Sequence, residues 1–151
     1  MIFSKSCVYG IRALIYLAGH HQGQFVPIKD ISKNLGISFH FLTKILQILS
    51  ENDLIASFKG PKGGVKLTLV PDSISLMHII LALDGSEIFD GCMLGLPDCS
   101  TQTPCPLHDE WTKQRDEMKI KFESITLRKL ADQVQEKGLR LYDINEIENA
   151  D

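Results

Sequence analysis

Apolar residues recur every three or four positions through the first third of the chain, which is the spacing of helices that bury one face. The pattern predicts helices over residues 4–20 and 28–35, and Gly36 stands where a glycine commonly ends a helix. Ser38 is placed to cap a third helix that runs to about Ser50. Two helices joined by such a short turn match a helix-turn-helix, whose second helix enters the major groove of DNA.

The third predicted helix separates into an apolar face and a polar face. At about 100° per residue, its aliphatic side chains and Phe41 fall on one side and its polar side chains fall on the other. The polar face carries His40, Thr43, Lys44, Gln47 and Ser50. Such a helix can pack on a core through one side and present hydrogen-bond donors on the other.

A two-stranded hairpin is predicted directly after this helix. Apolar positions alternate over residues 54–58 and 65–69, and the intervening GPKGG favours a turn because its glycines can take positive φ. Lys59, Lys62 and Lys66 lie at or near the predicted tip. Basic tips of this kind usually contact phosphates or the minor groove. The hairpin therefore predicts the wing of a winged helix-turn-helix.

The second half of the chain predicts two more helices, one on each side of a loop. Residues 71–73 should cap a mostly apolar helix from Ile74 to Leu83, in which we expect His78 to be a hydrogen-bonded core histidine. Beyond the loop, an apolar stripe predicts one long amphipathic helix from Leu107 to about Gly138. A helix of this kind most often packs on a partner chain.

These elements predict a mostly α fold with a small β-wing, a winged helix-turn-helix followed by a long C-terminal dimerisation helix. The expected divisions are a DNA-binding domain (1–84), a cysteine-rich loop (85–109), the dimerisation helix (110–137) and an acidic, poorly ordered tail (138–151).

Charge is divided unevenly along the chain. The net charge is −3, yet residues 1–70 hold eight Lys/Arg against three acids, whereas residues 71–151 hold eight against sixteen. A basic first half favours DNA binding over the alternative use of this scaffold, a winged-helix module that binds protein. The expected DNA contacts are Ser38, Phe39, His40, Thr43, Lys44, Gln47, Lys59 and Lys62.

Several function classes lack their sequence signals. There is no P-loop, dinucleotide-binding glycine motif, nucleophile elbow or zinc-protease helix, so we expect no enzyme. The apolar runs are too short for a membrane span, and no signal peptide precedes the first helix. The expected location is the cytoplasm, where four cysteines favour metal or redox chemistry over disulfides.

Three of the four cysteines lie in one Gly/Pro-rich loop, GCMLGLPDCSTQTPCPLH. Cys92, Cys99, Cys105 and His108 form a C-x6-C-x5-C-x2-H array, and thiolates projected toward one point can bind a soft metal or an iron–sulfur cluster. Structural zinc usually uses paired C-x2–4-C knuckles, so the wider spacing favours a cluster. Cys7, in the first helix, is expected to be a small buried residue and is otherwise the reserve ligand.

Four segments resemble the IscR/NsrR-type winged-helix transcription regulators, a family of iron–sulfur cluster sensors. They are the opening helix SKSCVYGIRALIYLA, the turn and helix LGISFHFLTKILQIL, the wing FKGPKGGVKL, and the cysteine loop with its CPLH end before a long helix. The resemblance extends to about residue 137. It implies a homodimer in which each recognition helix enters a major groove of a palindromic operator on double-stranded DNA.

The resemblance also implies an iron–sulfur cluster on Cys92, Cys99 and Cys105. His108 matches the histidine that completes a 2Fe-2S centre in IscR-like members, and we expect that centre over a 4Fe-4S one. Members with a 4Fe-4S centre take the fourth ligand from elsewhere, including the partner's first helix, where this chain offers Cys7. The expected protein is a regulator, most often a repressor in this family, that senses iron–sulfur, redox or nitric oxide status.

Three features depart from the family pattern. Lys59 replaces the arginine that opens the wing in many members, and the spacing from Cys92 to Cys99 is one residue longer than in IscR-like members. Thr43 and Lys44 differ from the residues expected in IscR, so its operator is not carried over. Two rival predictions remain, a zinc- or thiol-based sensor with the same DNA-binding domain and an iron–sulfur protein that acts without DNA.

Overall fold

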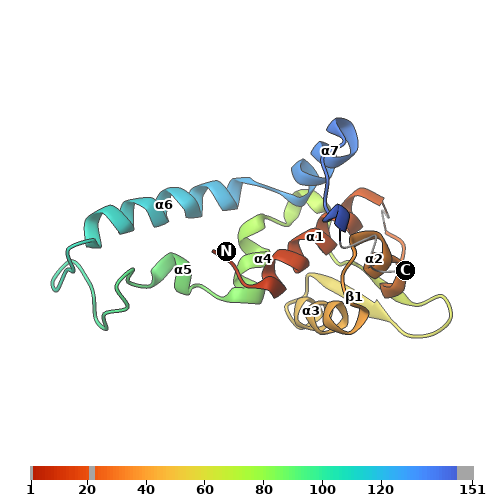
Figure 1. The fold of residues 1–151 in the computed structure, drawn as a ribbon, viewed down its shortest axis with the longest axis horizontal. Helices are drawn as coiled ribbons and strands as arrows, with labels where there is room; N and C mark the ends of the chain where they lie inside the picture. Colours follow the sequence, from red (N-terminus) through yellow and green to blue (C-terminus); the bar gives the residue numbers. More distant parts are fainter. Residues whose placement is uncertain (1, 21–22, 146–151) are drawn as a thin grey trace.

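The computed structural model describes residues 2–20 and 23–145. Its elements in chain order are α1 (Lys5–His20), α2 (Ile28–Leu35), α3 (Phe39–Glu51), β1 (Ile55–Phe58), β2 (Gly64–Leu67), the short 3-10 helix η1 (Pro71–Ser73), α4 (Leu76–Asp84), α5 (Glu87–Asp90), α6 (His108–Ser124) and α7 (Leu127–Lys137). A head formed by α1–α4, the hairpin and α7 carries an arm formed by α5, α6 and their connecting loop (Figure 1). The mostly helical fold with a small β-wing is confirmed.

Helix α1 is the centre of the head. It packs against α2, α3, α4, α7 and β2, and Ala13, Leu14 and Leu17 on its inner side are almost completely buried. Burial of one such leucine contributes about 1.5–3 kcal/mol to folding. The helix that opens the chain therefore holds the DNA-binding motif and the C-terminal helix to one core.

The helix-turn-helix is formed as predicted. Gly36 has a left-handed φ of 63°, and its N–H donates to the carbonyl of Ser32, which satisfies the end of α2. Ser38 precedes α3, although its side chain makes no capping hydrogen bond. Ile48, which was predicted to share the buried face of α3, is 36% exposed. The residues of α3 that are buried are Leu42, Ile45, Leu46 and Leu49.

The wing is an antiparallel hairpin of β1 and β2. A bridge between Val26 and Val65, with hydrogen bonds of 2.8 and 2.9 Å, ties the hairpin to the segment before α2. The predicted alternation is wrong at Phe58 and Leu69, which are 57% and 52% exposed. Phe58 instead lies against Phe25, with ring centroids 5.5 Å apart.

Helix α4 begins later than predicted. Residues 71–73 form η1, and Ser75 is the residue that caps α4. The Ser75 hydroxyl accepts from the backbone N–H of His78 at 3.3 Å, and Nδ1 of His78 accepts from the backbone N–H of Ser75 at 3.1 Å. The prediction of a core histidine is therefore wrong, because His78 is exposed and folds back to cap the start of its own helix.

The single helix predicted over residues 107–138 is two helices, α6 and α7. Ile125 and Thr126 are extended between them, and the Ile125 carbonyl accepts from the N–H of Leu76 at 2.8 Å. Thr126 then caps α7 by accepting from the N–H of Lys129. Two adjacent β-branched residues favour this extended break.

Part of the apolar stripe of these helices packs within the chain. Leu127 in α7 is completely buried in the main core, and α7 contacts α1. Phe122 in α6 lies against Phe3 and Phe89, with ring centroids 5.9 and 6.1 Å apart. Ile120, on the outer face of α6, is 68% exposed.

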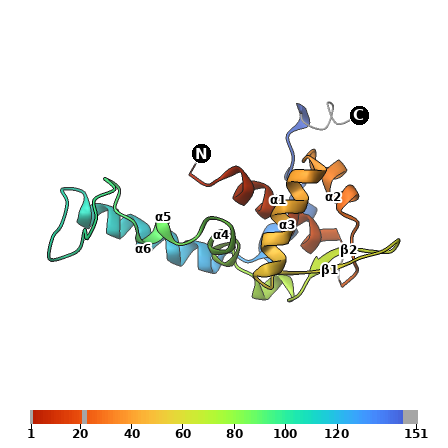
Figure 2. The same cartoon turned by 90° about the horizontal axis from the view of Figure 1, so that it is seen from below.

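The arm joins the head through a second apolar cluster, formed by Cys7, Met77, Ile80 and Phe89. Figures 1 and 2 place the loop at the end of the arm and the turn of the wing at opposite ends of the molecule. The tail predicted to be poorly ordered is described as far as residue 145, and Leu141 packs on the main core. Its residues 146–151 lie outside the described part.

No helix in the described ranges has the length and apolar character needed to cross a membrane.

Candidate metal centre

The loop between α5 and α6 is a succession of tight turns. Gly95 and Asp98 take left-handed φ values of 65° and 56°, and the N–H of Gly95 donates to the carbonyl of Cys92 at 3.0 Å. The hydroxyl of Thr103 donates to the carbonyl of Asp98 at 2.6 Å. Aspartate and glycine are residue types that accept the left-handed conformation, so the local sequence accounts for these turns.

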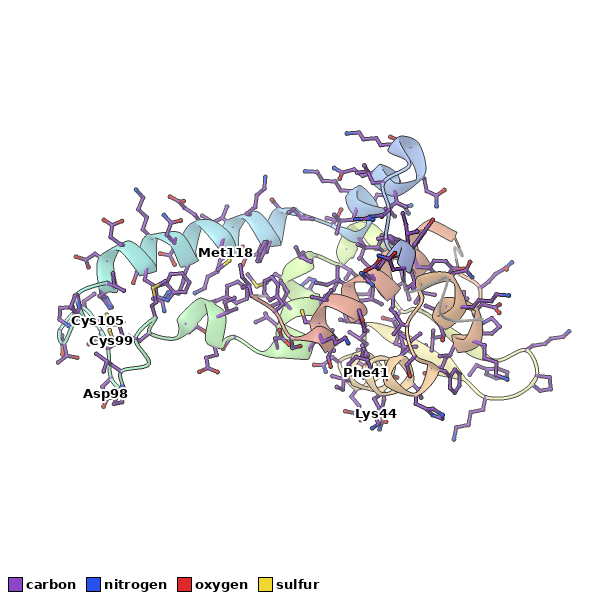
Figure 3. All side chains as sticks on the ribbon, viewed as in Figure 1. Phe41, Lys44, Asp98, Cys99, Cys105 and Met118 are labelled. Atoms are coloured by element: carbon purple, nitrogen blue, oxygen red, sulfur yellow. The ribbon has the colours of Figure 1, made fainter. Side chains whose placement is uncertain are left out.

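The three loop thiols converge. The Sγ atoms of Cys92, Cys99 and Cys105 all lie within 4.8 Å of one another, and those of Cys92 and Cys105 are 3.7 Å apart. Two thiolates on one tetrahedral ion, with bonds of ~2.3 Å, are separated by ~3.8 Å. All three side chains are half-buried, and Figure 3 shows Cys99 and Cys105 at the end of the arm. The structure thus brings the predicted thiols together.

His108 is the first residue of α6 and lines the same small cavity as the thiols. Its Nδ1 lies 3.3 Å from the Sγ of Cys99. It does not belong to the group of donors that are all within 4.8 Å of one another. His108 is therefore a neighbouring donor that is paired with one cysteine.

The loop backbone makes the three thiols unequal. Hydrogen bonds from the backbone of Leu96 and Leu94 lower the pKa of Cys92 to about 7. The backbone of Cys105 acts to lower the pKa of Cys99, but burial and the two neighbouring thiols outweigh it and raise that pKa. Of Cys92 and Cys99, Cys92 is therefore the one whose thiolate forms more readily.

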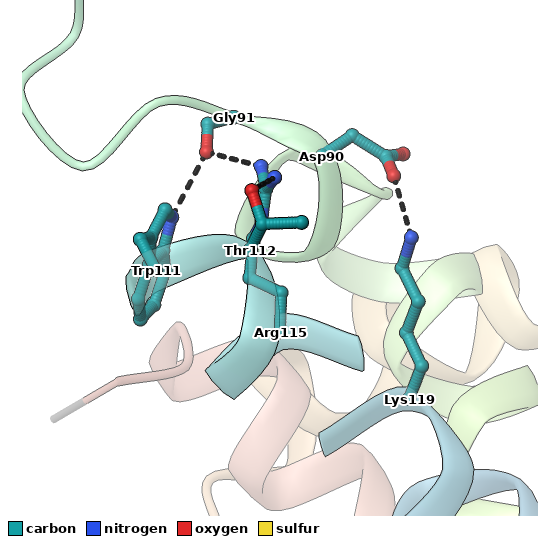
Figure 4. Close-up of polar contacts among 6 residues, drawn as sticks. All are labelled: Asp90, Gly91, Trp111, Thr112, Arg115 and Lys119. Carbon is teal, nitrogen blue, oxygen red and sulfur yellow. Dashed lines mark hydrogen bonds and ion pairs between the residues drawn. The ribbon is translucent and has the colours of Figure 1, made fainter. Parts of the chain in front are cut away.

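Two residues of α6 that sequence analysis did not select hold the base of this loop. Figure 4 shows the indole N–H of Trp111 and the guanidinium of Arg115 donating to the Gly91 carbonyl, at 3.0 and 2.7 Å. One helical turn further, Lys119 binds Asp90 at 2.9 Å, and this hydrogen bond lowers the pKa of Asp90. The sequence signal that could have pointed to Arg115 is its position as a single arginine within the apolar stripe of α6.

Cys7 is completely buried and is not among the converging donors in the described part of the chain. Burial, followed by the charge of Asp84 and a hydrogen bond with it, raises the pKa of Cys7 to about 12. Its N–H donates to the Ser4 hydroxyl at 3.0 Å. The prediction that Cys7 is a buried core residue is confirmed.

The candidate DNA contacts occupy α3 and the wing. Thr43 is half-buried, and its hydroxyl donates to the carbonyl of Phe39 at 2.8 Å. Figure 3 shows Lys44 on the head, away from Cys99 and Cys105 at the end of the arm. The exposed candidates are Ser38, Phe39, His40, Lys44, Gln47, Lys59 and Lys62.

Comparison with known proteins identifies the class. The family model Rrf2, described as an iron-dependent transcriptional regulator, matches residues 3–133. The chain belongs to the Rrf2 family. The IscR of Aliivibrio salmonicida (strain LFI1238), an HTH-type transcriptional regulator, is 34% identical to this Rrf2 chain over 122 residues, which cover 81% of the chain and 72% of the relative.

Solved structures agree with the Rrf2 assignment. CymR (YrzC), the global cysteine regulator of B. subtilis, is 29% identical with a TM-score of 0.74, over 86% of this chain and 95% of that one. The T. potens IscR is 26% identical with a TM-score of 0.71, over 91% and 90%. The fold class and the prediction of a DNA-binding transcription regulator rather than an enzyme are confirmed by these Rrf2 relatives.

Proposed function

We propose that this Rrf2 protein is a homodimeric, sequence-specific transcription regulator whose binding to DNA depends on an iron–sulfur cluster in the cysteine loop. The observation that carries the proposal is the convergence of three thiols within 4.8 Å of one another at the start of α6. Sulfur donors of this kind, half-buried in a loop, fit the ligand preference of such a cluster. We expect the regulator to act in the cytoplasm and as a repressor.

Cys92, Cys99, Cys105 and His108 would hold the cluster. The donors occur as two close pairs, Cys92 with Cys105 and Cys99 with His108. A histidine paired with a cysteine supports a 2Fe-2S centre over a 4Fe-4S one. When bound, the cluster would supply a redox- and nitric oxide-sensitive group whose gain or loss changes the charge and the ligand bonds of the loop.

The loop leads directly into α6, so a change in what the thiols bind would shift the start of that helix. His108 is both a donor of the site and the first residue of α6. The outer face of α6, with Ile120 exposed, is the surface we assign to the second protomer. A shift of α6 would change the separation of two recognition helices, and such coupling typically amounts to ~1–3 kcal/mol.

On DNA, we assign α3 to the major groove and the wing to phosphates or the minor groove. Ser38, Phe39, His40, Thr43, Lys44 and Gln47 would lie along the major groove, and Lys59 and Lys62 would contact the flanking backbone. The palindromic operator is expected from the two-fold symmetry of a dimer.

Anaerobic purification tests the cluster. We expect visible absorption with about two irons and two sulfides per chain. Cys92→Ala, Cys99→Ala and Cys105→Ala should each abolish the absorption, because each removes a thiolate. Cys7→Ala is the matched control and should retain it, since Cys7 lies in the core. A colourless, iron-free wild-type protein under these conditions would overturn the cluster proposal.

Footprinting on the promoter of the protein's own gene tests the DNA-binding part. The cluster-loaded protein should protect a palindromic site, and the Cys99→Ala protein should protect it with altered affinity. Sedimentation of the loaded protein should give a dimer. Absence of protection by every form on duplex DNA would favour the rival in which an iron–sulfur protein acts without DNA.

A second candidate is a sensor that binds one zinc ion. It is favoured by one observation, the compactness of the donor group: the 3.7 Å separation of Cys92 and Cys105 matches ligands of a single tetrahedral ion. Zinc at one equivalent per chain, with no sulfide, would establish this candidate in place of the cluster.

A further inference from the structure

Arg115 lines the cavity that contains the three loop thiols. Its Nη1 donates to the Gly91 carbonyl at 2.7 Å, and the indole N–H of Trp111 donates to the same oxygen at 3.0 Å. Gly91 directly precedes Cys92 in the chain. Two side chains of α6 thus hold the peptide unit from which the cysteine loop begins (Figure 4).

Gly91 is also fixed from the side of α5. Its N–H donates to the Glu87 carbonyl at 2.6 Å, and a Cβ added at Gly91 would stand 2.6 Å from that same oxygen. The backbone at Gly91 therefore has little room to move toward α5. A movement of Cys92 would therefore also move Gly91 and, through its hydrogen bonds, the part of α6 that carries Arg115.

The charge of Arg115 is incompletely compensated. Its Nη2 donates to the Thr112 hydroxyl at 3.1 Å, and its Nε is buried without a hydrogen-bond partner. Among the described residues it forms no ion pair, and Asp90, the carboxylate lining the cavity, feels the charge of Arg115 but binds Lys119. A half-buried cation whose hydrogen bonds all go to neutral acceptors is stabilised when negative charge develops beside it.

We propose that Arg115 is a positioning residue of the cysteine site, which clamps Gly91 and provides the counter-charge for metal-bound thiolates. The inference rests on the proposed function in one respect, namely that the loop thiols bind a metal or cluster. The inference goes beyond the proposed function because it names the residue that connects the loop to α6. A residue that acted only by stabilising the arm would affect the affinity for a cation to the same extent whether glutamine or lysine replaced it.

The test uses the full-length, reduced, metal-free protein with Co²⁺ alone as the probe. Arg115→Gln removes the charge and the forked donor. We expect it to weaken Co²⁺ binding, followed through the thiolate-to-cobalt absorption, by about tenfold or more. We also expect faster hydrogen–deuterium exchange in residues 91–106, with unchanged exchange in α1 and α3.

Lys121→Gln is the matched control, because it removes the charge of an exposed lysine on the same helix and leaves the contacts of Gly91 and Asp90 in place. A single exposed charge contributes little, so this variant should bind Co²⁺ as the wild type does. Arg115→Lys keeps the charge without the fork, and it should recover part of the Co²⁺ affinity while loop exchange remains fast. If the glutamine variant does not fold, the comparison of Arg115→Lys with the wild type tests the inference instead.

The inference is overturned if Arg115→Gln changes Co²⁺ affinity and loop exchange no more than Lys121→Gln does. This result is independent of the native cofactor, because a wild-type protein that holds zinc, or no metal after purification, still has a Co²⁺ affinity to compare. Failure of the cluster proposal would appear in the iron and sulfide counts of the wild type instead.

Discussion

The Sγ atoms of Cys92 and Cys105 lie 3.7 Å apart, although the two residues are thirteen positions apart in the chain. The remaining loop thiol, Cys99, has His108 as its close neighbour at 3.3 Å. The fold of the loop therefore gives the cysteines different close neighbours. Cys92 and Cys105 are in direct sulfur–sulfur contact, and Cys99 lies beside an imidazole.

Mild oxidation of the metal-free protein should therefore link Cys92 to Cys105. Diamide takes up the two thiol protons and two electrons as the disulfide forms, and the sulfurs have to approach to ~2.05 Å. Peptide mapping by mass spectrometry identifies the linked pair. A product dominated by a disulfide of Cys99, or by Cys7, would contradict the arrangement.

The pH dependence of alkylation should separate Cys92 from Cys7. A pKa of about 7 for Cys92, set by backbone hydrogen bonds from Leu96 and Leu94, means that its reactive thiolate forms between pH 6 and 8. Its rate with iodoacetamide should rise about tenfold over that interval and then level off. Cys7, with a pKa raised to about 12 by burial, should remain an unreactive thiol throughout. Mass spectrometry of the metal-free protein gives each rate, and a Cys92 rate still rising above pH 9 would contradict the assignment.

The helix-turn-helix could be predicted because its signals are local. Gly36 adopts the left-handed φ that its position suggested, and the division of α3 into two faces followed from helical spacing. The convergence of the thiols was also foreseeable, since a Gly/Pro-rich loop can fold three cysteines onto one point. The local sequence pattern could not predict which neighbouring side chain each thiol contacts.

The failures have a common physical cause. The break at Ile125 depends on a backbone hydrogen bond with Leu76, which lies 49 positions earlier in the chain, so helical periodicity alone continued the helix. His78 was misassigned because its neighbours are apolar, whereas its ring reaches back to the N–H of Ser75. Arg115 was overlooked because its acceptor, the Gly91 carbonyl, is a backbone atom that leaves no side-chain signal.

Replacement of two lysines should test the DNA-binding surface. Lys44 on α3 and Lys59 on the wing are both exposed. If each contacts a phosphate, Lys44→Ala with Lys59→Ala should reduce the slope of log affinity against log salt by about 1.8. Lys113→Ala, an exposed position on α6, should leave the slope unchanged. Fluorescence anisotropy with the footprinted duplex supplies the slopes, and equal slopes for the double variant and the wild type would show that the DNA-binding surface lies elsewhere.

The attachment of the wing to the head should depend on the glycine at position 64. Gly64 opens β2 with a φ of 150°, and a Cβ there would collide with the carbonyl of Val26, the group that accepts the N–H of Val65 at 2.9 Å. Gly64→Ala should therefore detach the hairpin from the segment before α2, with a loss of about 2–4 kcal/mol in the free energy of unfolding. Gly60, with a φ of 119°, has open space around an added Cβ, so Gly60→Ala isolates the cost of backbone strain. Urea unfolding compares the two, and equal losses would mean that the clash with Val26 adds nothing to the cost of backbone strain.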